Sequence, residues 1–167
     1  ILMDIYCPSL TNYQRLKTRC VMVGNVGIGG NNPIRVQSMT TTDTMDTEGT
    51  ISQSIRMIEA GCEIIRITAP SIKEAENLKN IKEGLRNKGY ATPIVADIHF
   101  TPNAAKIAAR IVDKVRINPG NYADRKKFET HDYTDQTYTN ELDRIRERFT
   151  PLVKICKENG TSMRIGT

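Results

Sequence analysis

The stretch KVRINPGN, residues 114–121, decides the fold. Val115 and Ile117 alternate with polar residues, as expected for a strand with one buried face. Arg116 lies between them, although arginine is rarely buried without a partner because removing its charge from water is costly. The same arrangement of arginine followed by isoleucine recurs in IIRIT (64–68) and MRIG (163–166). Three arginines therefore share one kind of strand environment.

Length and composition indicate one soluble globular domain. The chain has 167 residues, of which 38% are apolar and 26% are charged. It contains no apolar run long enough to span a membrane, and its first residues, ILMDIYCPSL, lack the basic start and long apolar stretch of a signal peptide. Because it does not begin with methionine, we expect that it has been cut from a longer protein.

The net charge of +5 is compatible with nucleic acid, a membrane surface or an acidic small substrate. The 24 Lys and Arg residues are spread along the chain, which is typical of a solvated surface. Phe, Tyr and Trp make up only 5% of the residues, and no RNA-reading aromatic motif is present. A nucleic-acid partner is therefore disfavoured, although a basic nucleic-acid-binding domain stays open as an alternative that salt-dependent binding to a random oligonucleotide would support.

The four cysteines do not form a recognisable metal or disulfide pattern. None of them has CxxC spacing, and two histidines cannot supply a zinc finger. Without a secretory signal a disulfide framework is not expected either. We interpret Cys62 and Cys156 as small core residues rather than metal ligands. The other two are Cys7 and Cys20.

Strand-like and helix-like segments alternate along most of the chain. Regular alternation of this kind predicts parallel strands joined by right-handed crossovers. The strand-like runs are IRVQSM (34–39), EIIRIT (63–68), PIVADIH (93–99), KVRIN (114–118) and TSMRIG (161–166). The first helix is expected over 47–60, the second from Ser71 to Gly89 and the third from Thr101, with Ala105, Ala108, Ile111 and Val112 on its buried side.

Two of the expected helices begin with capping signals. Ser71 followed by Glu74 predicts a capping box, in which each side chain satisfies a free backbone N–H. Thr101 before Pro102 predicts a helix cap followed by proline at the first helical position. Both signals place helix starts directly after strands.

The fourth connection is longer than the others. Residues 119–136 are polar and charged, and they lead to a helical segment that Gly160 closes. Pro151 lies inside that segment and is expected to kink or divide it. His131, in the polar part of the connection, is expected to be solvated.

A glycine-rich stretch precedes the first strand. RCVMVGNVGIGGNNP, residues 19–33, predicts a small hairpin. A phosphate-binding loop would follow a strand and open a helix, whereas these glycines come before a strand and no GxxxxGK[ST] motif is present. Turn formation is therefore the better interpretation of the glycines.

The arginines can be explained by the alternation of strand side chains, which has a period of two residues. In each run the apolar residues would face the helices, and the polar residues would collect on the opposite face at the carboxyl ends of the strands. In an (α/β) barrel that face points inward at the mouth, where active sites lie. The residues that share this position are Arg66, Asp97, His99, Arg116, Asn118 and Arg164.

Converging guanidinium groups favour a ligand with more than one phosphate charge, because the planar fork matches phosphate oxygens. Asp97 would add an acceptor, His99 a titratable donor and Asn118 a neutral donor and acceptor. The alternative is that each arginine pairs for structural reasons with a carboxylate such as Asp97 or Glu63. His99 is equally compatible with a structural histidine and with a site residue.

Four blocks of the sequence together resemble one enzyme family. They are VQSMTTTDT (36–44), ADIHFTPNAA (96–105), VRINPGN (115–121) and the terminal MRIGT. The family is 4-hydroxy-3-methylbut-2-enyl diphosphate synthase of the methylerythritol phosphate route to isoprenoids, in the long form of plants and some bacteria. The resemblance implies a TIM barrel followed by an iron–sulfur domain. Residues 1–33 would be an N-terminal extension with a hairpin, and 34–167 would supply about five of the eight barrel strands.

The family reductively opens 2-C-methyl-D-erythritol 2,4-cyclodiphosphate to an allylic diphosphate, using a 4Fe-4S cluster and electrons from ferredoxin or flavodoxin. The resemblance implies that the arginines hold the diphosphate and that the DIH and RIN motifs also meet substrate. The implied substrate-binding residues are Gln37, Arg66, Asp97, His99, Arg116, Asn118 and Arg164.

The resemblance also implies what to expect elsewhere in the protein. The cluster ligands and the catalytic acid would lie beyond residue 167, since none of the four cysteines matches a cluster ligand, and this chain alone is expected to be inactive. The complete protein would work in the bacterial cytoplasm or the plastid stroma as a homodimer, with neither nucleic acid nor membrane as a partner. A redox-inactive barrel that binds a pterin or sugar phosphate remains the alternative, and a downstream CxxC with a third cysteine would favour the reductase.

Overall fold

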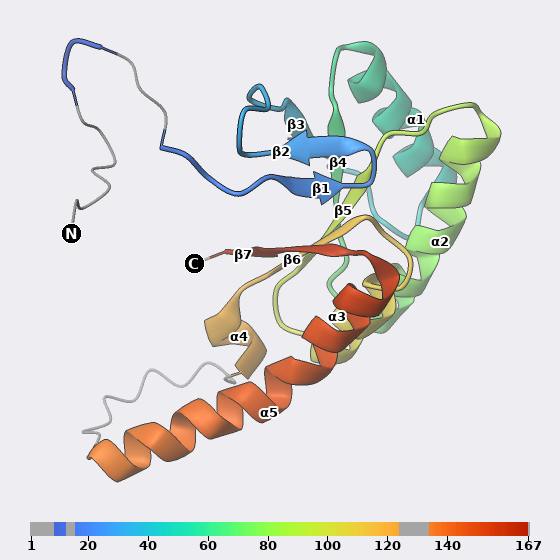
Figure 1. The fold of residues 1–167 in the computed structure, drawn as a ribbon. Helices are drawn as coiled ribbons and strands as arrows, with labels where there is room; N and C mark the ends of the chain where they lie inside the picture. The colour runs from blue at the N-terminus through green and yellow to red at the C-terminus, as the bar shows by residue number, and fades with distance from the viewer. Residues whose placement is uncertain (1–8, 13–15, 124–133, 167) are drawn as a thin grey trace.

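The computed structural model describes residues 9–12, 16–123 and 134–166. Its centre is a parallel sheet of five strands in the order β3-β4-β5-β6-β7, which is also their order along the chain (Figure 1). The strands are β3 (Gln37–Met39), β4 (Ile64–Thr68), β5 (Ile94–Ile98), β6 (Lys114–Ile117) and β7 (Ser162–Ile165). Sequential parallel strands joined by helices are the start of a (β/α) barrel, as the sequence predicts.

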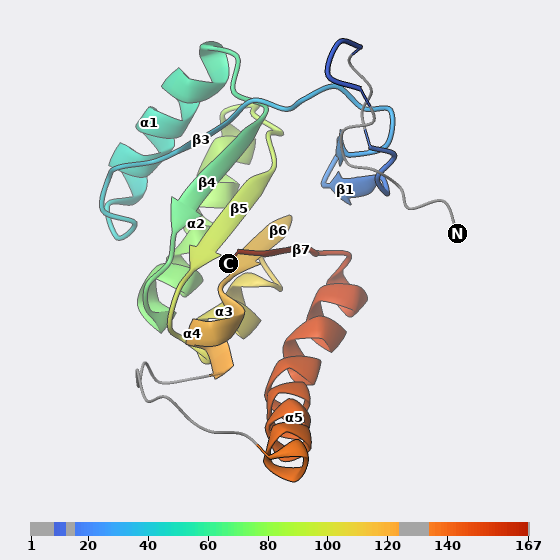
Figure 2. The ribbon, with the colours of Figure 1, turned by 90° about the vertical axis from the view of Figure 1, so that its left-hand side faces the viewer.

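Helices connect the strands and lie on one side of the sheet (Figure 2). Neighbouring helices pack against one another in the same order as the strands that precede them. The helices are α1 (Thr47–Glu59), α2 (Ile72–Asn87), α3 (Pro102–Ala108), α4 (Pro119–Ala123) and α5 (Asp135–Asn159). The other face of the sheet is left open to form the inside of the barrel.

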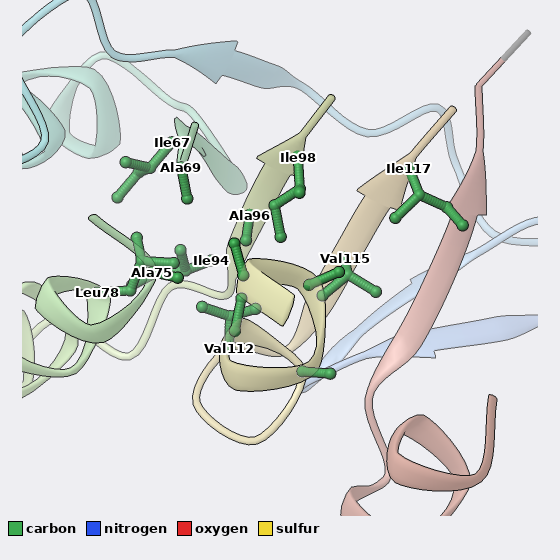
Figure 3. Close-up of a cluster of buried hydrophobic side chains, with 14 of the residues drawn as sticks. Ile67, Ala69, Ala75, Leu78, Ile94, Ala96, Ile98, Val112, Val115 and Ile117 are labelled. Carbon is green, nitrogen blue, oxygen red and sulfur yellow. The ribbon is translucent and has the colours of Figure 1, made fainter. Parts of the chain in front are cut away.

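The core lies between the sheet and the helices (Figure 3). On β4 the side chains of Ile65 and Ile67 are buried against the helices, whereas Arg66 and Thr68 are only partly buried on the other face. Val115 and Ile117 of β6 repeat this arrangement around Arg116. The predicted division into a helix-facing apolar side and an interior polar side is therefore confirmed around Arg66 on β4 and Arg116 on β6, whereas all five residues of β5 are buried and Ile165 of β7 is half-exposed.

The predicted N-terminal hairpin is present and packs beside the sheet. Strands β1 (Val21–Val23) and β2 (Val26–Ile28) pair in antiparallel fashion, and β1 also contacts β7. Gly24, with a φ of 55°, opens the two-residue turn between them, where a left-handed conformation matches the twist of the strands. Val23 is completely buried, so the hairpin is docked on the barrel fragment.

Three details of the helices differ from the sequence-based expectations. α5 runs through Pro151 as one helix, so the predicted division is wrong. α3 ends at Ala108, so Ile111 and Val112 lie in the turn that follows it. The polar connection after β6 begins with the short helix α4, which the sequence analysis missed.

The two predicted caps are only partly right. The Ser71 hydroxyl accepts from the backbone N–H of Lys73, one residue earlier than in a capping box, and the Glu74 carboxylate contacts Ser71 in return. Thr101 precedes α3, but its hydroxyl donates to the carbonyl oxygen of Pro70 at 2.9 Å rather than capping the helix. Pro102 does occupy the first helical turn.

No helix within the described residues is long and apolar enough to cross a membrane.

Candidate anion-binding site

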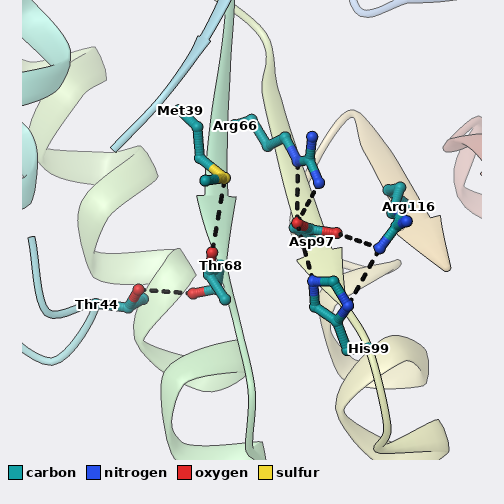
Figure 4. Close-up of polar contacts among 7 residues, drawn as sticks. All are labelled: Met39, Thr44, Arg66, Thr68, Asp97, His99 and Arg116. Atoms are coloured by element: carbon teal, nitrogen blue, oxygen red, sulfur yellow. Dashed lines mark hydrogen bonds and ion pairs between the residues drawn. The ribbon is translucent and has the colours of Figure 1, made fainter. Parts of the chain in front are cut away.

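Polar side chains form rows across the interior face of the sheet. Strand register places Thr68 opposite Asp97, Asp97 opposite Arg116, and Arg116 opposite Arg164. This row joins the carboxyl ends of four adjacent strands, which is the mouth of a (β/α) barrel. Arg66 lies two residues before Thr68 on β4, opposite Val95, and its side chain reaches toward the carboxyl ends of the strands to contact Asp97 (Figure 4).

Asp97 is the centre of this site. It is only 1% exposed, and it forms ion pairs with two arginines. The Arg66 guanidinium donates to Asp97 Oδ2 through Nε at 3.0 Å and also through Nη2, whereas Arg116 Nη1 donates to Oδ1 at 3.3 Å. A buried carboxylate with partners on both oxygens fixes the positions of the two guanidinium groups.

His99 completes the network around Asp97. Its Nε2 lies 3.2 Å from Asp97 Oδ2, and its Nδ1 lies 3.2 Å from Arg116 Nη1. Arginine nitrogens only donate, so His99 Nδ1 must accept from Arg116 and Nε2–H must donate to Asp97. The contacts therefore select the neutral Nε2–H tautomer of His99 (Figure 4).

Structural pairing with a carboxylate is thus observed for Arg66 and Arg116, as the alternative interpretation expected. Glu63 does not take part, because it pairs instead with Arg35 at 2.7 Å. The Arg164 side chain has no hydrogen bond or ion pair to any residue that the structure describes. Three guanidinium groups on this face consequently accompany a single buried carboxylate, which leaves a surplus of positive charge.

Several arginine donors remain available. Among the described residues, Nε and Nη2 of Arg116 and Nη1 of Arg66 have no hydrogen-bond partner. The Arg116 and Arg66 side chains are nevertheless only 16% and 24% exposed. Partly buried guanidinium donors of this kind suit an anion that replaces their lost water.

Asn118 and Gln37 lie apart from the network around Asp97. Asn118 Oδ1 accepts from the backbone N–H of Asn121 at 3.2 Å, so the side chain caps α4 and its oxygen is already used. Gln37 lies on the same interior face as Ile64 and is exposed, but its side chain makes no hydrogen bond within the described part of the chain. Asn118 therefore caps α4 through Oδ1, and substrate binding by Asn118 and Gln37 stays a prediction.

Two residues at this face escaped the sequence analysis. Lys114 lies two residues below Arg116 on the interior side of β6 and is half-buried. Burial, and then the positive charge of Arg164, lower the pKa of Lys114. The alternation that revealed the arginines also applies to Lys114, so the signal was present. Gly166, by contrast, touches Arg116 in a way that only the coordinates show.

The described cysteines do not come together as ligands of an iron–sulfur cluster would. Cys62 and Cys156 are buried in the core, as predicted, and Cys20 is exposed, whereas Cys7 and His131 lie outside the described residues. Burial raises the pKa of the Cys156 thiol, which is the opposite of what a thiolate ligand requires. Within 9–12, 16–123 and 134–166, no group of three or more His, Cys, Asp or Glu side chains converges to hold a metal ion. These residues do not fit an iron–sulfur cluster.

Residues 18–167 match the model of the GcpE TIM-barrel domain. The chain belongs to the GcpE family. This assignment agrees with the five consecutive parallel strands and with the polar mouth that they form.

Several curated relatives of the GcpE chain carry the name 4-hydroxy-3-methylbut-2-en-1-yl diphosphate synthase (flavodoxin). The Akkermansia muciniphila protein is 57% identical over 97% of this chain and 28% of its own length. The Leptospira interrogans protein is 57% identical over 93% of this chain and 23% of its own length. The Protochlamydia amoebophila protein is 54% identical over 97% of this chain and 25% of its own length. The chain therefore spans about a quarter of the length of the curated relatives it matches.

Among solved structures, a Burkholderia cenocepacia dihydropteroate synthase has a TM-score of 0.47 and 18% identity, over 81% of this chain and 59% of that one. A likeness this distant has no bearing on the activity of the GcpE chain.

Proposed function

We propose that this chain is the N-terminal, substrate-binding part of a 4-hydroxy-3-methylbut-2-en-1-yl diphosphate synthase. In this proposal residues 1–33 form an extension with a docked hairpin, and residues 34–167 form the first part of the barrel. The chain is part of a longer protein of the same length as its relatives, which we call the full-length protein. The observation that carries the proposal is the surplus of guanidinium charge over carboxylate at the carboxyl ends of adjacent strands.

The ligand of this site is a diphosphate held by Arg66, Arg116 and Arg164. Each guanidinium offers paired N–H donors that match phosphate oxygens, and two of the three are already oriented by Asp97. Lys114 adds a further positive charge on the same face. A group with two phosphates, such as 2-C-methyl-D-erythritol 2,4-cyclodiphosphate, balances this charge better than a single phosphate does.

Asp97 and His99 act chiefly as positioning residues in this proposal. Both oxygens of Asp97 hold arginine donors, and both ring nitrogens of His99 are engaged. Orientation of a partly buried cation before the ligand arrives reduces the cost of binding. A His99→Asn variant that keeps full turnover across pH would exclude an essential acid–base role for His99.

The reductive ring opening belongs to the full-length protein. Its 4Fe-4S cluster supplies the electrons and would be held by residues outside this chain, since the described cysteines do not fit that group. The relatives' printed name points to flavodoxin as the electron donor, and ferredoxin is the alternative. A bacterial cytoplasm or plastid stroma and a homodimeric state complete the proposal, with neither nucleic acid nor membrane as a partner.

The test is calorimetric binding of the cyclic diphosphate to the full-length protein and to its Arg66→Ala, Arg116→Ala and Arg164→Ala variants. Each substitution is expected to weaken binding by about 1.5–3 kcal/mol, the scale of a hydrogen bond to a charged group. Lys157→Ala, an exposed cation on α5, is the matched control and should bind normally. Unchanged affinity in all three arginine variants would contradict the assignment of the ligand as a diphosphate.

A second measurement separates the reductase from a redox-inactive phosphate-binding barrel. The reconstituted full-length protein should convert the cyclic diphosphate when reduced flavodoxin or ferredoxin is supplied. Tight binding without turnover by the reconstituted protein would favour the redox-inactive alternative.

A further inference from the structure

The guanidinium of Arg116 lies against Gly166. A Cβ atom built on Gly166 would be 2.7 Å from Arg116 Nη2 and 2.8 Å from Cζ, and closer still to Nε. Real Cβ atoms essentially never approach other heavy atoms within 3.0 Å. Any side chain at position 166 would therefore force the guanidinium of Arg116 to move.

The backbone itself does not require glycine at this position. Six glycines of the described chain have a positive φ, and Gly166 is not one of them. Its N–H donates to the carbonyl oxygen of Ile117 at 2.8 Å, which continues the pairing of β6 with β7. Because Gly166 has no positive φ, its backbone does not exclude alanine, and the constraint at this position comes from the Arg116 guanidinium.

The position of Gly166 in the sheet explains why the contact exists. Ile98, Ile117 and Ile165 are paired across β5, β6 and β7, so the next residues in the same register are His99, Asn118 and Gly166. The first two of these carry side chains at the barrel mouth, whereas Gly166 leaves a gap. Arg116 turns its guanidinium into that gap while its Nη1 reaches Asp97 and His99.

We propose that Gly166 is a positioning residue that holds the Arg116 guanidinium in place for anion binding by keeping this gap open. The inference rests on the proposed function, in which Arg116 binds the diphosphate. The 3.3 Å contact with Asp97 and the 3.2 Å contact with His99 Nδ1 both depend on this placement. A side chain at position 166 would meet the Nε–Nη2 edge of the guanidinium, so it would displace Arg116 and obstruct the two donors that the anion would otherwise reach.

The test is a double-mutant cycle of Gly166→Ala and Arg116→Ala in the full-length protein. Binding of 2-C-methyl-D-erythritol 2,4-cyclodiphosphate is measured by calorimetry, and the Tm of all four proteins is measured without ligand. Gly166→Ala alone should weaken binding about 10- to 100-fold, the scale of one lost charge-assisted contact. In the Arg116→Ala background, where the guanidinium is absent, Gly166→Ala should change neither affinity nor Tm further.

Gly120→Ala is the matched control, because a Cβ there meets nothing closer than Asn118 Oδ1 at 3.5 Å, and it should bind normally. Effects of Gly166→Ala that persist undiminished in the Arg116→Ala background would overturn the inference, since they would show a role unconnected with Arg116. Absence of binding by the wild-type protein would overturn the proposed function instead. The Tm half of the cycle would then still decide whether Gly166 acts through Arg116.

Discussion

Asp97 shows how one buried carboxylate organises this barrel mouth. It receives donors from Arg66 and Arg116 and lies beside His99. Asp97→Asn would keep the shape but remove the charge that both guanidinium groups face. We expect a loss of about 1–3 kcal/mol in the free energy of unfolding, measured by denaturant titration of the full-length protein.

Glu76→Gln is the control for Asp97→Asn, because Glu76 is exposed on α2 and its charge should contribute little. A loss no larger than that of the control would show that Asp97 does not hold the arginines. Excess phosphate should recover part of the lost stability in the Asp97→Asn variant, since an anion can replace the missing charge.

The charge of Lys114 is expected to destabilise the folded state, in contrast to the charge of Asp97. Burial and the charge of Arg164 lower its pKa below 10.5 in the folded state, so the charged lysine destabilises the fold at neutral pH. The penalty is complete below the lowered pKa and fades as the pH rises toward the unfolded value. Lys114→Met should therefore raise the Tm near pH 7, and the gain should shrink by about pH 10.

Lys154→Met, on the exposed side of α5, should leave the Tm nearly unchanged at both pH values. A lower Tm for Lys114→Met at neutral pH would mean that Lys114 has an anionic partner in the full-length barrel. That result would show that Lys114 pairs with an anion there as well as facing the like charge of Arg164.

The hairpin formed by β1 and β2 is joined to the barrel by hydrogen bonds among four residues, which we call the clasp. Arg35 donates to the carbonyl oxygen of Gly27 at 2.9 Å and to Glu63 at 2.7 Å, and the other Glu63 oxygen accepts from the Val36 N–H at 2.9 Å. The Val36 N–H, and then Arg35, hold the pKa of Glu63 below its usual value of 4.5. Ionised Glu63 therefore stabilises the folded state.

This stabilisation is full above the unfolded pKa of Glu63 and is lost as the pH falls through the lowered folded pKa. Glu63→Gln should lower the Tm of the full-length protein at neutral pH, and the two Tm values should converge below about pH 4. Amide exchange at Val36 should quicken in the variant, which localises the effect to the clasp. A Tm difference that stays constant from neutral to acidic pH would contradict this account.

The alternation of strand side chains was predictable because it follows from covalent geometry, and it placed Arg66, Arg116 and Arg164 on one face. The continuity of α5 was not, because it depends on burial of Leu152 and Cys156 after Pro151. A proline costs one hydrogen bond and a local clash, which packing of the following turn can offset. Cap partners were also missed, since Ser, Thr and Asn side chains choose between nearby donors and acceptors at similar energies.

The common position of Arg66, Asp97, His99 and Arg116 was predictable from the strands, but the hydrogen-bond network among them was not. Strand position gave Asp97 and His99 their common face, whereas their hydrogen bonds depend on the side-chain conformation of Arg116. The role of Gly166 depends on that same conformation and on a neighbouring strand, so no local pattern announces it. Side-chain contacts between residues on different strands could not be predicted from local sequence patterns.

The sheet as a whole is an open arc rather than a closed barrel in the described part of the chain. Its edge strands are β3 and β7, as the sequence predicts. Met39 on β3 is 44% exposed and Ile165 on β7 is 50% exposed. Unpaired backbone groups beside exposed apolar side chains are a template for pairing with another chain.

We therefore expect the purified 167-residue chain to associate rather than persist as a monomer. Sedimentation velocity should show dimers or larger species, and Ile165→Lys should reduce them because a charged residue on an edge strand blocks strand pairing. Val153→Lys is the matched control, since Val153 is 44% exposed on α5, away from the edge strands, and should leave association unchanged.

The purified chain should also fail to open the cyclic diphosphate after iron–sulfur reconstitution, because its described cysteines do not converge. A monodisperse monomer that melts cooperatively would contradict the first expectation, and turnover would reopen the question of whether the cysteines are ligands.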